Sequence, residues 1–313
     1  MGERIKRSFG SSGPPAGVFR RAPENPRSTM AGAGFTGYRS GAAPGIDGYD
    51  RGGRRGKIGI SGEFDITTRQ PSRGSVMDLK EVDVLGAGVG DHWYYASKAS
   101  AIRRFLGESG ANRILDVGAG SGFFSKHLLE RTQATEAWCV DTSYADDSDG
   151  EAAGKPIHYR RSVDRFDADL VLLMDVLEHV DDDVGLLTQY VKGAPSGSRF
   201  LITVPAFQFL WSGHDDFLEH KRRYTLGGLE DVVRRAGLDV EHGAYYFGLT
   251  FPLAAALRLG ERARSHPREP ASQLRRHHPF VNGLLKTICR IELPMFRFNR
   301  VAGLTVICVA RKR

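Results

Sequence analysis

The 313-residue chain has no apolar run long enough to cross a lipid bilayer and no apolar segment of the kind found in secretory signal peptides. Both absences argue against secretion and membrane spanning, so the sequence predicts a cytoplasmic protein. Its three cysteines are an odd number without C-x-x-C spacing, so they indicate neither a disulfide framework nor a zinc site. Cys139 and Cys308 fall within apolar segments, where cysteine is typically a small buried hydrophobic residue.

Residues 1–76 lack any periodic apolar pattern and are dominated by Gly, Ser, Pro and Arg. A segment of this composition cannot bury enough apolar surface to offset its chain entropy, so we expect a disordered tail. Residues 77–313 contain the periodic apolar segments and are expected to form one folded domain. A translation start at Met77 is an alternative that would omit the tail.

Charge is distributed unevenly along the chain. Residues 1–76 have 13 basic and 6 acidic side chains, residues 77–254 have 18 and 28, and residues 255–313 have 13 and 3. The acidic centre argues against nucleic acid as a partner, because a phosphate backbone is bound by basic surfaces. The basic ends favour an anionic surface or ligand near the termini, although the N-terminal charge is equally consistent with a solvated tail.

Residues 113–125 (R-I-L-D-V-G-A-G-S-G-F-F-S) join an apolar strand to a helix through three glycines at alternate positions. The absence of side chains at Gly118, Gly120 and Gly122 lets a ligand approach the backbone closely. The dinucleotide fingerprint G-x-G-x-x-G is not present, because Phe123 stands where its third glycine would fall. The turn therefore predicts a nucleotide cofactor other than NAD or FAD.

This turn of an acid and three glycines resembles the first motif of the class I S-adenosylmethionine (SAM)-dependent methyltransferases. Later segments extend the resemblance over residues 92–312, and D-V-L-E-H and H-K-R-R-Y-T segments are similar to those of one bacterial group. The resemblance implies SAM as the cofactor. It also implies an α/β fold, with a Rossmann-like, doubly wound, mostly parallel seven-stranded sheet whose last strand lies antiparallel between the fifth and sixth. The implied cofactor-binding residues are Asp116, Gly118, Ala119, Gly120, Gly122, Asp141 and Asp175.

Apolar segments alternate with helical patterns, which favours a parallel sheet with ligands at the carboxyl ends of its strands. Asp141 ends the second segment, where a carboxylate can bind ribose hydroxyls. A helix is expected between the N-cap Thr225 and Gly237. Strands are expected at 113–117, 137–141, 157–160, 170–175, 199–204, 239–246 and 303–310.

Residues 247–302 are much longer than the hairpin connection that the resemblance implies, so we expect a helical insertion before the last strand. Its apolar segment Phe247–Leu257 is too short to span a bilayer. Three alternatives remain: a helix packed on the sheet edge, an oligomer contact, or peripheral contact with a lipid surface through residues 247–276. The arginines expected to border such a surface are Arg258, Arg262, Arg264, Arg268, Arg275 and Arg276.

Transfer of a methyl group to a hydroxyl requires a base, because the acceptor must lose its proton. His179 is the first candidate, at the end of D-V-L-E-H, a segment that resembles the E-x-x-E-H of quinone O-methyltransferases. In those enzymes the acids and the histidine have been proposed to hold a divalent metal. Asp175 shortens the first of these ligands here, so we expect no metal. Alternatively, Asp175 serves the cofactor while Glu178 and His179 only begin the next helix.

Further candidates lie in the loop after the fifth strand, where residues overhang the same sheet edge as the glycine turn. His214 and His220 are candidate bases there. Tyr94, before the first core helix, is expected to close over the acceptor or to pack as part of a flap. The loop also supplies a set of residues expected to form either a substrate lid or a salt-bridged brace, namely Asp215, Arg222, Arg223 and Tyr224.

The sequence thus predicts a SAM-dependent methyltransferase that acts on a small-molecule or lipid-like acceptor, at oxygen. A SAM-binding regulatory or scaffolding protein without catalysis is the alternative. Nucleic-acid methylation is disfavoured, because the chain reads D-V-L-E after the fourth strand and has no N-P-P-Y or D-P-P-Y motif there.

Deletion of residues 1–76 should leave the melting temperature and the SAM affinity unchanged, because a segment that buries no core contributes no packing. Scanning calorimetry and SAM titration of the full and truncated chains test this. A large drop in melting temperature would show that the tail packs on the domain.

Overall fold

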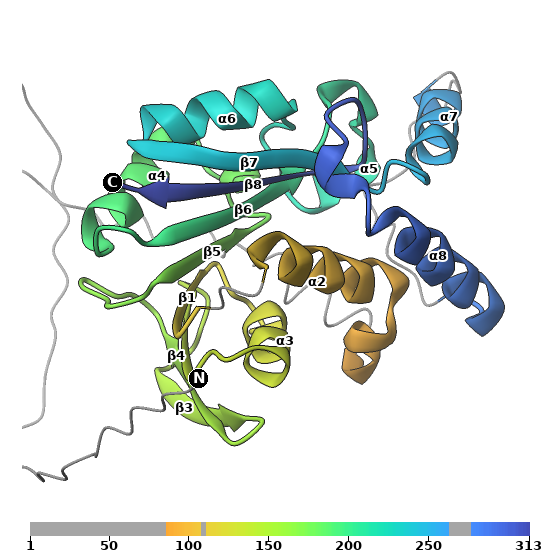
Figure 1. Ribbon diagram of the computed structural model, residues 1–313. Coiled ribbons are helices and arrows are strands. Elements are labelled where there is room, and N and C mark those ends of the chain that lie inside the picture. The colour runs from red at the N-terminus through yellow and green to blue at the C-terminus, as the bar shows by residue number, and fades with distance from the viewer. Residues whose placement is uncertain (1–85, 108–110, 263–276) are drawn as a thin grey trace, which may run out of the picture. The chain divides into compact units, whose positions relative to one another are not determined.

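The computed structural model describes residues 86–107, 111–262 and 277–313 (Figure 1). All of them belong to a compact unit that spans Thr68–Arg313. The segment expected to be disordered, residues 1–76, lies outside the described residues, as do Arg264, Arg268, Arg275 and Arg276.

The core of the unit is one eight-stranded sheet in the order β3-β4-β2-β1-β5-β6-β8-β7. β4, β2, β1, β5 and β6 run parallel, and β8 lies antiparallel between β6 and β7. The predicted strands and the position of the last one are therefore confirmed. The strands are β1 (Arg113–Val117), β2 (Glu136–Val140), β3 (Ser148–Ala152), β4 (Lys155–Arg160), β5 (Leu170–Met174), β6 (Arg199–Pro205), β7 (Leu238–Tyr246) and β8 (Thr305–Lys312).

The sheet has one strand more than the seven expected, the edge strand β3. It pairs antiparallel with β4 through a two-residue turn at Ala153 and Gly154. Their φ angles of 53° and 74° are both positive, as a type I′ hairpin turn requires. Four of the five residues of β3 are exposed, so it lacks the apolar alternation that marks a strand in a sequence.

Helices cover both faces of the sheet (Figure 1). α2 and α3 pack over the core that contains Leu172, whereas α4 and α6 pack over the core that contains Leu173. The two leucines belong to different cores because successive side chains of a strand point to opposite faces. These helices are α2 (Trp93–Leu106), α3 (Phe123–Arg131), α4 (Asp183–Gly193) and α6 (Leu226–Arg235).

α6 begins and ends at the predicted signals. The Thr225 side chain accepts a hydrogen bond from the Gly228 N–H at 3.1 Å, which caps the first turn. After the helix, Gly237 has a φ of 92°, a conformation that glycine adopts without strain. Short helical segments lie elsewhere, at η1 (Gly86–Asp91), η2 (Leu177–His179), η3 (Gln208–Leu210) and α5 (Gly213–Phe217).

The expected insertion contains α7 (Phe251–Arg262), α8 (Pro279–Glu292) and η4 (Phe296–Phe298). A third buried cluster joins α8 to α2 and to the end of β7, and it includes Cys289 and Phe247. α7, in contrast, buries none of its residues. Within the part of the chain that the structure describes, no helix combines the length and apolar character needed to cross a membrane.

Candidate functional site

The parallel strands β2, β1, β5 and β6 end at one edge of the sheet, which is the edge where such sheets bind ligands. The segments that leave these strands contain almost all of the site residues predicted from the sequence. These segments are the glycine turn 118–122, Asp141, the segment 175–179, and the loop 211–225.

The glycine turn has the backbone conformation for which glycine is required. φ is +66° at Gly118, +51° at Gly120 and +69° at Gly122, a region that side chains disfavour. A Cβ at Gly118 would lie 2.8 Å from a methyl group of Val176, so the turn packs directly on the segment after β5. The Gly118 N–H also donates to the Val140 carbonyl oxygen at 2.8 Å. These contacts fix the turn between its two neighbouring strands.

Asp116 and Ala119 support the turn from within the domain, because their exposed fractions are only 1% and 7%. Oδ2 of Asp116 accepts a hydrogen bond from the Ser125 hydroxyl at 2.7 Å. This bond joins the end of β1 to the first turn of α3, so Asp116 positions the backbone of the turn.

Asp141 lies directly beside the turn. Its Oδ2 accepts a hydrogen bond from the Gly120 N–H at 3.0 Å, and its Oδ1 accepts two from the N–H and hydroxyl of Ser143 at 3.0 and 2.7 Å. A carboxylate has about four acceptor positions, so roughly one remains, on Oδ2, for a ligand hydroxyl. Tyr144, which sequence reasoning missed, donates to the Gly120 carbonyl oxygen at 2.6 Å.

A buried ion pair joins α2 to the end of β5. Lys98 is fully buried and donates to Oδ2 of Asp175 and, at 3.4 Å, to the hydroxyl of Tyr94. Burial by itself lowers the pKa of Lys98, but the charge and hydrogen bond of Asp175, together with Tyr94 and Glu178, outweigh it, and the net effect is a raised pKa. Oδ1 of Asp175 accepts from the Thr203 hydroxyl at 3.0 Å. Both carboxylate oxygens of Asp175 are therefore engaged within the protein.

Tyr94 connects this edge of the sheet with the insertion. Its half-buried ring stacks on Phe247, with ring centroids 5.2 Å apart and an interplanar angle of 16°. Phe247 is fully buried and directly follows β7. The structure therefore places Tyr94 within the first turn of α2, not before the first core helix as expected, and packs its ring against the residue that follows β7.

Glu178, His179 and His220 come together from two different loops. The Lys221 N–H donates to the Glu178 carbonyl oxygen at 2.7 Å, which holds the loop after β6 against the segment after β5. The rings of His179 and His220 meet edge to face with centroids 4.8 Å apart. Glu178 is fully buried, and burial together with the nearby charge of Asp175 raises its pKa.

Asp215 organises the loop after β6. Its buried carboxylate accepts from the Ser212 N–H at 2.8 Å, bonds to Nδ1 of His220 at 2.8 Å, and forms a two-point ion pair with Arg223 at 2.6 and 2.9 Å. Burial raises the pKa of Asp215, but the hydrogen bonds from His220 and Arg223 hold it well below its usual range. Asp215 is therefore ionised at neutral pH and orients His220.

Arg222 and Tyr224 bind the same two loops to each other. Arg222 donates to the carbonyl oxygens of Val180 and Asp181 at 3.0 and 2.8 Å. The Tyr224 hydroxyl donates to Asp183 at 2.8 Å. The expected brace is present in the ion pair between Arg223 and Asp215, and these contacts add to it. A role of the same segment as a substrate lid stays a prediction.

His214 lies in a charged but buried environment. The groups that act most strongly on it are Arg258, Asp215, His220 and Arg223. Burial lowers the pKa of His214 to about 4, and the charge of Arg258 adds to this effect. Arg258 itself turns into the protein and donates to the Leu210 carbonyl oxygen at 3.0 Å. Burial and the neighbouring Arg223 lower the pKa of Arg258 to about 10.

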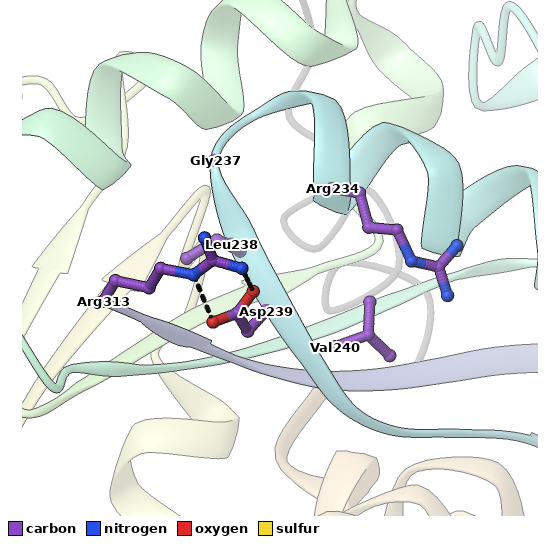
Figure 2. A pocket seen from close by; sticks show the side chains of 6 residues that line it. All are labelled: Arg234, Gly237, Leu238, Asp239, Val240 and Arg313. Atoms are coloured by element: carbon purple, nitrogen blue, oxygen red, sulfur yellow. Dashed lines mark hydrogen bonds and ion pairs between the residues drawn. The ribbon is translucent and has the colours of Figure 1, made fainter.

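A surface pocket of about 570 Å³ lies at the opposite edge of the sheet. Figure 2 shows the ion pair between Asp239 and Arg313 in its lining. Leu238 of this lining pairs with Lys312 at the end of β8, which lies with the amino ends of the parallel strands because β8 is antiparallel to β6. The pocket is therefore separate from the candidate site.

Acidification from pH 7 to pH 5 should destabilise the protein through His214. Its native pKa is about 4 and its ordinary value is 6.5, so in this range the unfolded chain binds a proton that the native protein does not. Stability therefore falls as the pH falls, by about 2 kcal/mol at pH 5. In urea unfolding, the free energy of unfolding should fall less between pH 7 and pH 5 for His214→Gln than for the wild type. Equal losses in this variant and the wild type would contradict the assignment, and His278→Gln, at an exposed histidine, is the control.

Comparison with known proteins identifies the domain. Residues 91–243 match the family model of a methyltransferase domain. No protein of curated function matches the sequence. A chain from the Haloferax volcanii complex of a methyltransferase with the Trm112 methyltransferase activator is similar at 16% identity and a TM-score of 0.48, over 77% of this chain and 97% of that chain. A SAM-dependent methyltransferase from Mesorhizobium loti is similar at 18% identity and a TM-score of 0.44, over 70% and 100%.

The family match covers the segments that form the site, namely the glycine turn, Asp141, D-V-L-E-H and the loop 211–225. The sheet order, with β8 antiparallel between β6 and β7, agrees with the order that the sequence resemblance implied. Three glycines with positive φ and an acceptor position on Asp141 fit the ribose and backbone contacts of SAM. Residues 91–243 are therefore a class I SAM-dependent methyltransferase domain, and SAM is its cofactor.

Proposed function

We propose that the protein transfers the methyl group of SAM to a hydroxyl oxygen of an apolar small molecule or lipid-like acceptor. The observation that supports this acceptor class is the apolar surface of α7, α8 and their flanking segments. Exposed apolar surface can mark a binding site, and α7 and α8 each expose several large apolar side chains. The large apolar side chains exposed here are Leu249, Leu253, Leu257, Leu259, Phe280, Val281, Leu284, Ile291, Met295, Phe298 and Val301.

This apolar surface is connected to the candidate site at two points. Tyr94 stacks on Phe247 at the start of the insertion, and Arg258 of α7 bonds to Leu210 in the loop after β6. Both contacts favour an acceptor that lies on the insertion and extends its hydroxyl towards the sheet edge. Exposed basic residues on the same insertion, such as Arg262 and Arg290, would favour an anionic surface.

Transfer to oxygen is supported by the groups available for proton removal. Bound SAM supplies a methyl group activated by the positive sulfonium, and alignment of the acceptor is worth about 7–11 kcal/mol of barrier. A hydroxyl acceptor must in addition lose its proton. The cluster of Glu178, His179 and His220 places three candidate proton acceptors at the edge of the sheet that also contains the glycine turn. An amine acceptor would not require them.

Asp141→Ala should weaken SAM binding by more than tenfold, because a hydrogen bond to a charged group contributes about 1.5–3 kcal/mol. Calorimetric titration measures the affinity, and circular dichroism checks that the loss of the bond to Gly120 has not unfolded the variant. Asp146→Ala, at an exposed aspartate a few residues away, is the matched control. An unchanged affinity in Asp141→Ala would remove Asp141 from the cofactor site.

The same variant serves as the negative control for the reaction. Incubation of the wild type with SAM and an extract of lipids and small molecules should produce a species heavier by one methylene group, detected by mass spectrometry. Asp141→Ala should produce much less of it. Binding of SAM without any such product would favour the alternative of a regulatory or scaffolding protein.

Charge reversal at Arg262, Arg290 and Arg297 should reduce co-sedimentation with anionic vesicles, since each exposed arginine contributes about 1 kcal/mol near such a surface. The SAM affinity should remain unchanged. Charge reversal at Arg103, Arg104 and Arg235, three exposed arginines outside the insertion, controls for the change in net charge. A wild-type protein that does not sediment with these vesicles would remove the lipid surface from the proposal and leave an apolar small molecule as the acceptor.

A further inference from the structure

We propose that Glu178, His179 and His220 bind a divalent first-row transition-metal ion. Each residue offers one ligand atom, and the three atoms lie within 4.8 Å of one another. Two imidazoles and one carboxylate suit Zn²⁺, Fe²⁺ and similar ions, whereas Mg²⁺ and Ca²⁺ prefer oxygen ligands. The sequence-based expectation of no metal rested on the shortened side chain of Asp175, which is paired with Lys98 and is not one of these three ligands.

Glu178 provides the first independent observation. The residue is fully buried, and neither of its carboxylate oxygens has a hydrogen-bond partner among the described residues. A buried carboxyl group without a partner is costly, and the cost is largest when the group is ionised. The two buried cations whose charges act on Glu178, Lys98 and Arg223, donate to Asp175 and Asp215 instead. A metal ion would supply the partner that the Glu178 carboxylate lacks among the described residues.

His220 provides the second observation. Its Nε2 is buried and has no hydrogen-bond partner within the described ranges, whereas its Nδ1 is bonded to Asp215 at 2.8 Å. A histidine with a carboxylate on one nitrogen and the metal on the other is the usual arrangement of a histidine ligand. Arg223 stabilises the ionised form of Asp215. Asp215 is therefore a positioning residue that directs the Nε2 lone pair towards the ion.

His179 completes the set from the segment after β5. Its ring meets that of His220 at an interplanar angle of 76°. A tetrahedral ion with bonds of about 2.0–2.2 Å holds its ligand atoms about 3.3–3.6 Å apart, so side-chain rotations must bring the three atoms closer by up to about 1.5 Å. Three protein ligands leave at least one coordination position open, as in catalytic rather than structural metal sites.

The role of the ion, unlike its binding, rests on the proposed function. An acceptor hydroxyl at the open position loses its proton to water more readily than in solution. The oxygen then forms a bond to the methyl carbon as the carbon–sulfur bond of SAM breaks. The products are a methyl ether, S-adenosylhomocysteine and one proton. In this scheme His220 acts as a ligand and not as the base.

Titration with Zn²⁺ and Co²⁺ tests the site on the full chain, without a histidine tag and after treatment with a chelator. Calorimetry should give one Zn²⁺ per chain. Co²⁺ should give the visible absorption typical of a four-coordinate site with nitrogen and oxygen ligands. Glu178→Gln and His220→Gln should each weaken Zn²⁺ binding at least tenfold. His158→Gln is the matched control, because His158 also lies between two carboxylates, 2.6 Å from Asp149 and 3.9 Å from Glu136.

The site would be overturned if the wild type bound no Zn²⁺. It would also be overturned if His220→Gln bound Zn²⁺ as tightly as the wild type does. Loss of binding in His158→Gln alone would do the same. SAM titration checks that each variant is folded, and His179→Gln replaces His220→Gln if the latter does not fold. Zn²⁺ binding without methyl transfer would refute the proposed function and leave the site intact. Methyl transfer by a protein that does not bind Zn²⁺ would refute the site only.

Discussion

The parallel pairing of β1 with both β2 and β5 is the constraint on which the site depends. Val117 is paired with Val140 on one side and with Leu173 on the other, so the three strands end at the same level. The chain must therefore turn at one common edge after each of them. Asp141 and Asp175 follow the neighbouring strands almost at once, and the glycines allow the turn between them to be tight. Strand order thus brings residues distant in sequence to one ligand-binding edge.

Buried charges at this edge are stabilised by partners that come from other elements. Lys98 of α2 pairs with Asp175, and Arg223 pairs with Asp215. Removal of one partner from such a pair leaves an uncompensated buried charge, which is typically more costly than loss of an exposed pair. Because these pairs form within the protein, they hold the polar groups in place without a ligand. Glu178 is the buried acid for which no hydrogen-bond partner is found among the described residues.

Features with local signals were predictable from the sequence, such as the apolar strands, the glycine turn and the cap at Thr225. Features that depend on tertiary contacts were not. The edge strand Ser148–Ala152 has no apolar alternation, and its hairpin forms because β4 offers an unpaired edge. Lys98 lies on the buried face of α2. Its position among apolar residues was the only sequence signal that this lysine would be buried. The approach of the Glu178 and His220 ligand atoms to within 4.8 Å joins two segments distant in sequence, and neither segment by itself predicts it.

We propose that the glycine turn and Asp141 form a site for SAM rather than for a dinucleotide. Calorimetric titration of the full chain with SAM and, separately, with NAD tests this claim most directly. We expect one SAM to bind per chain and NAD to give no measurable heat of binding, because Phe123 stands where the dinucleotide motif requires its third glycine. Saturable binding of NAD together with no binding of SAM would contradict it.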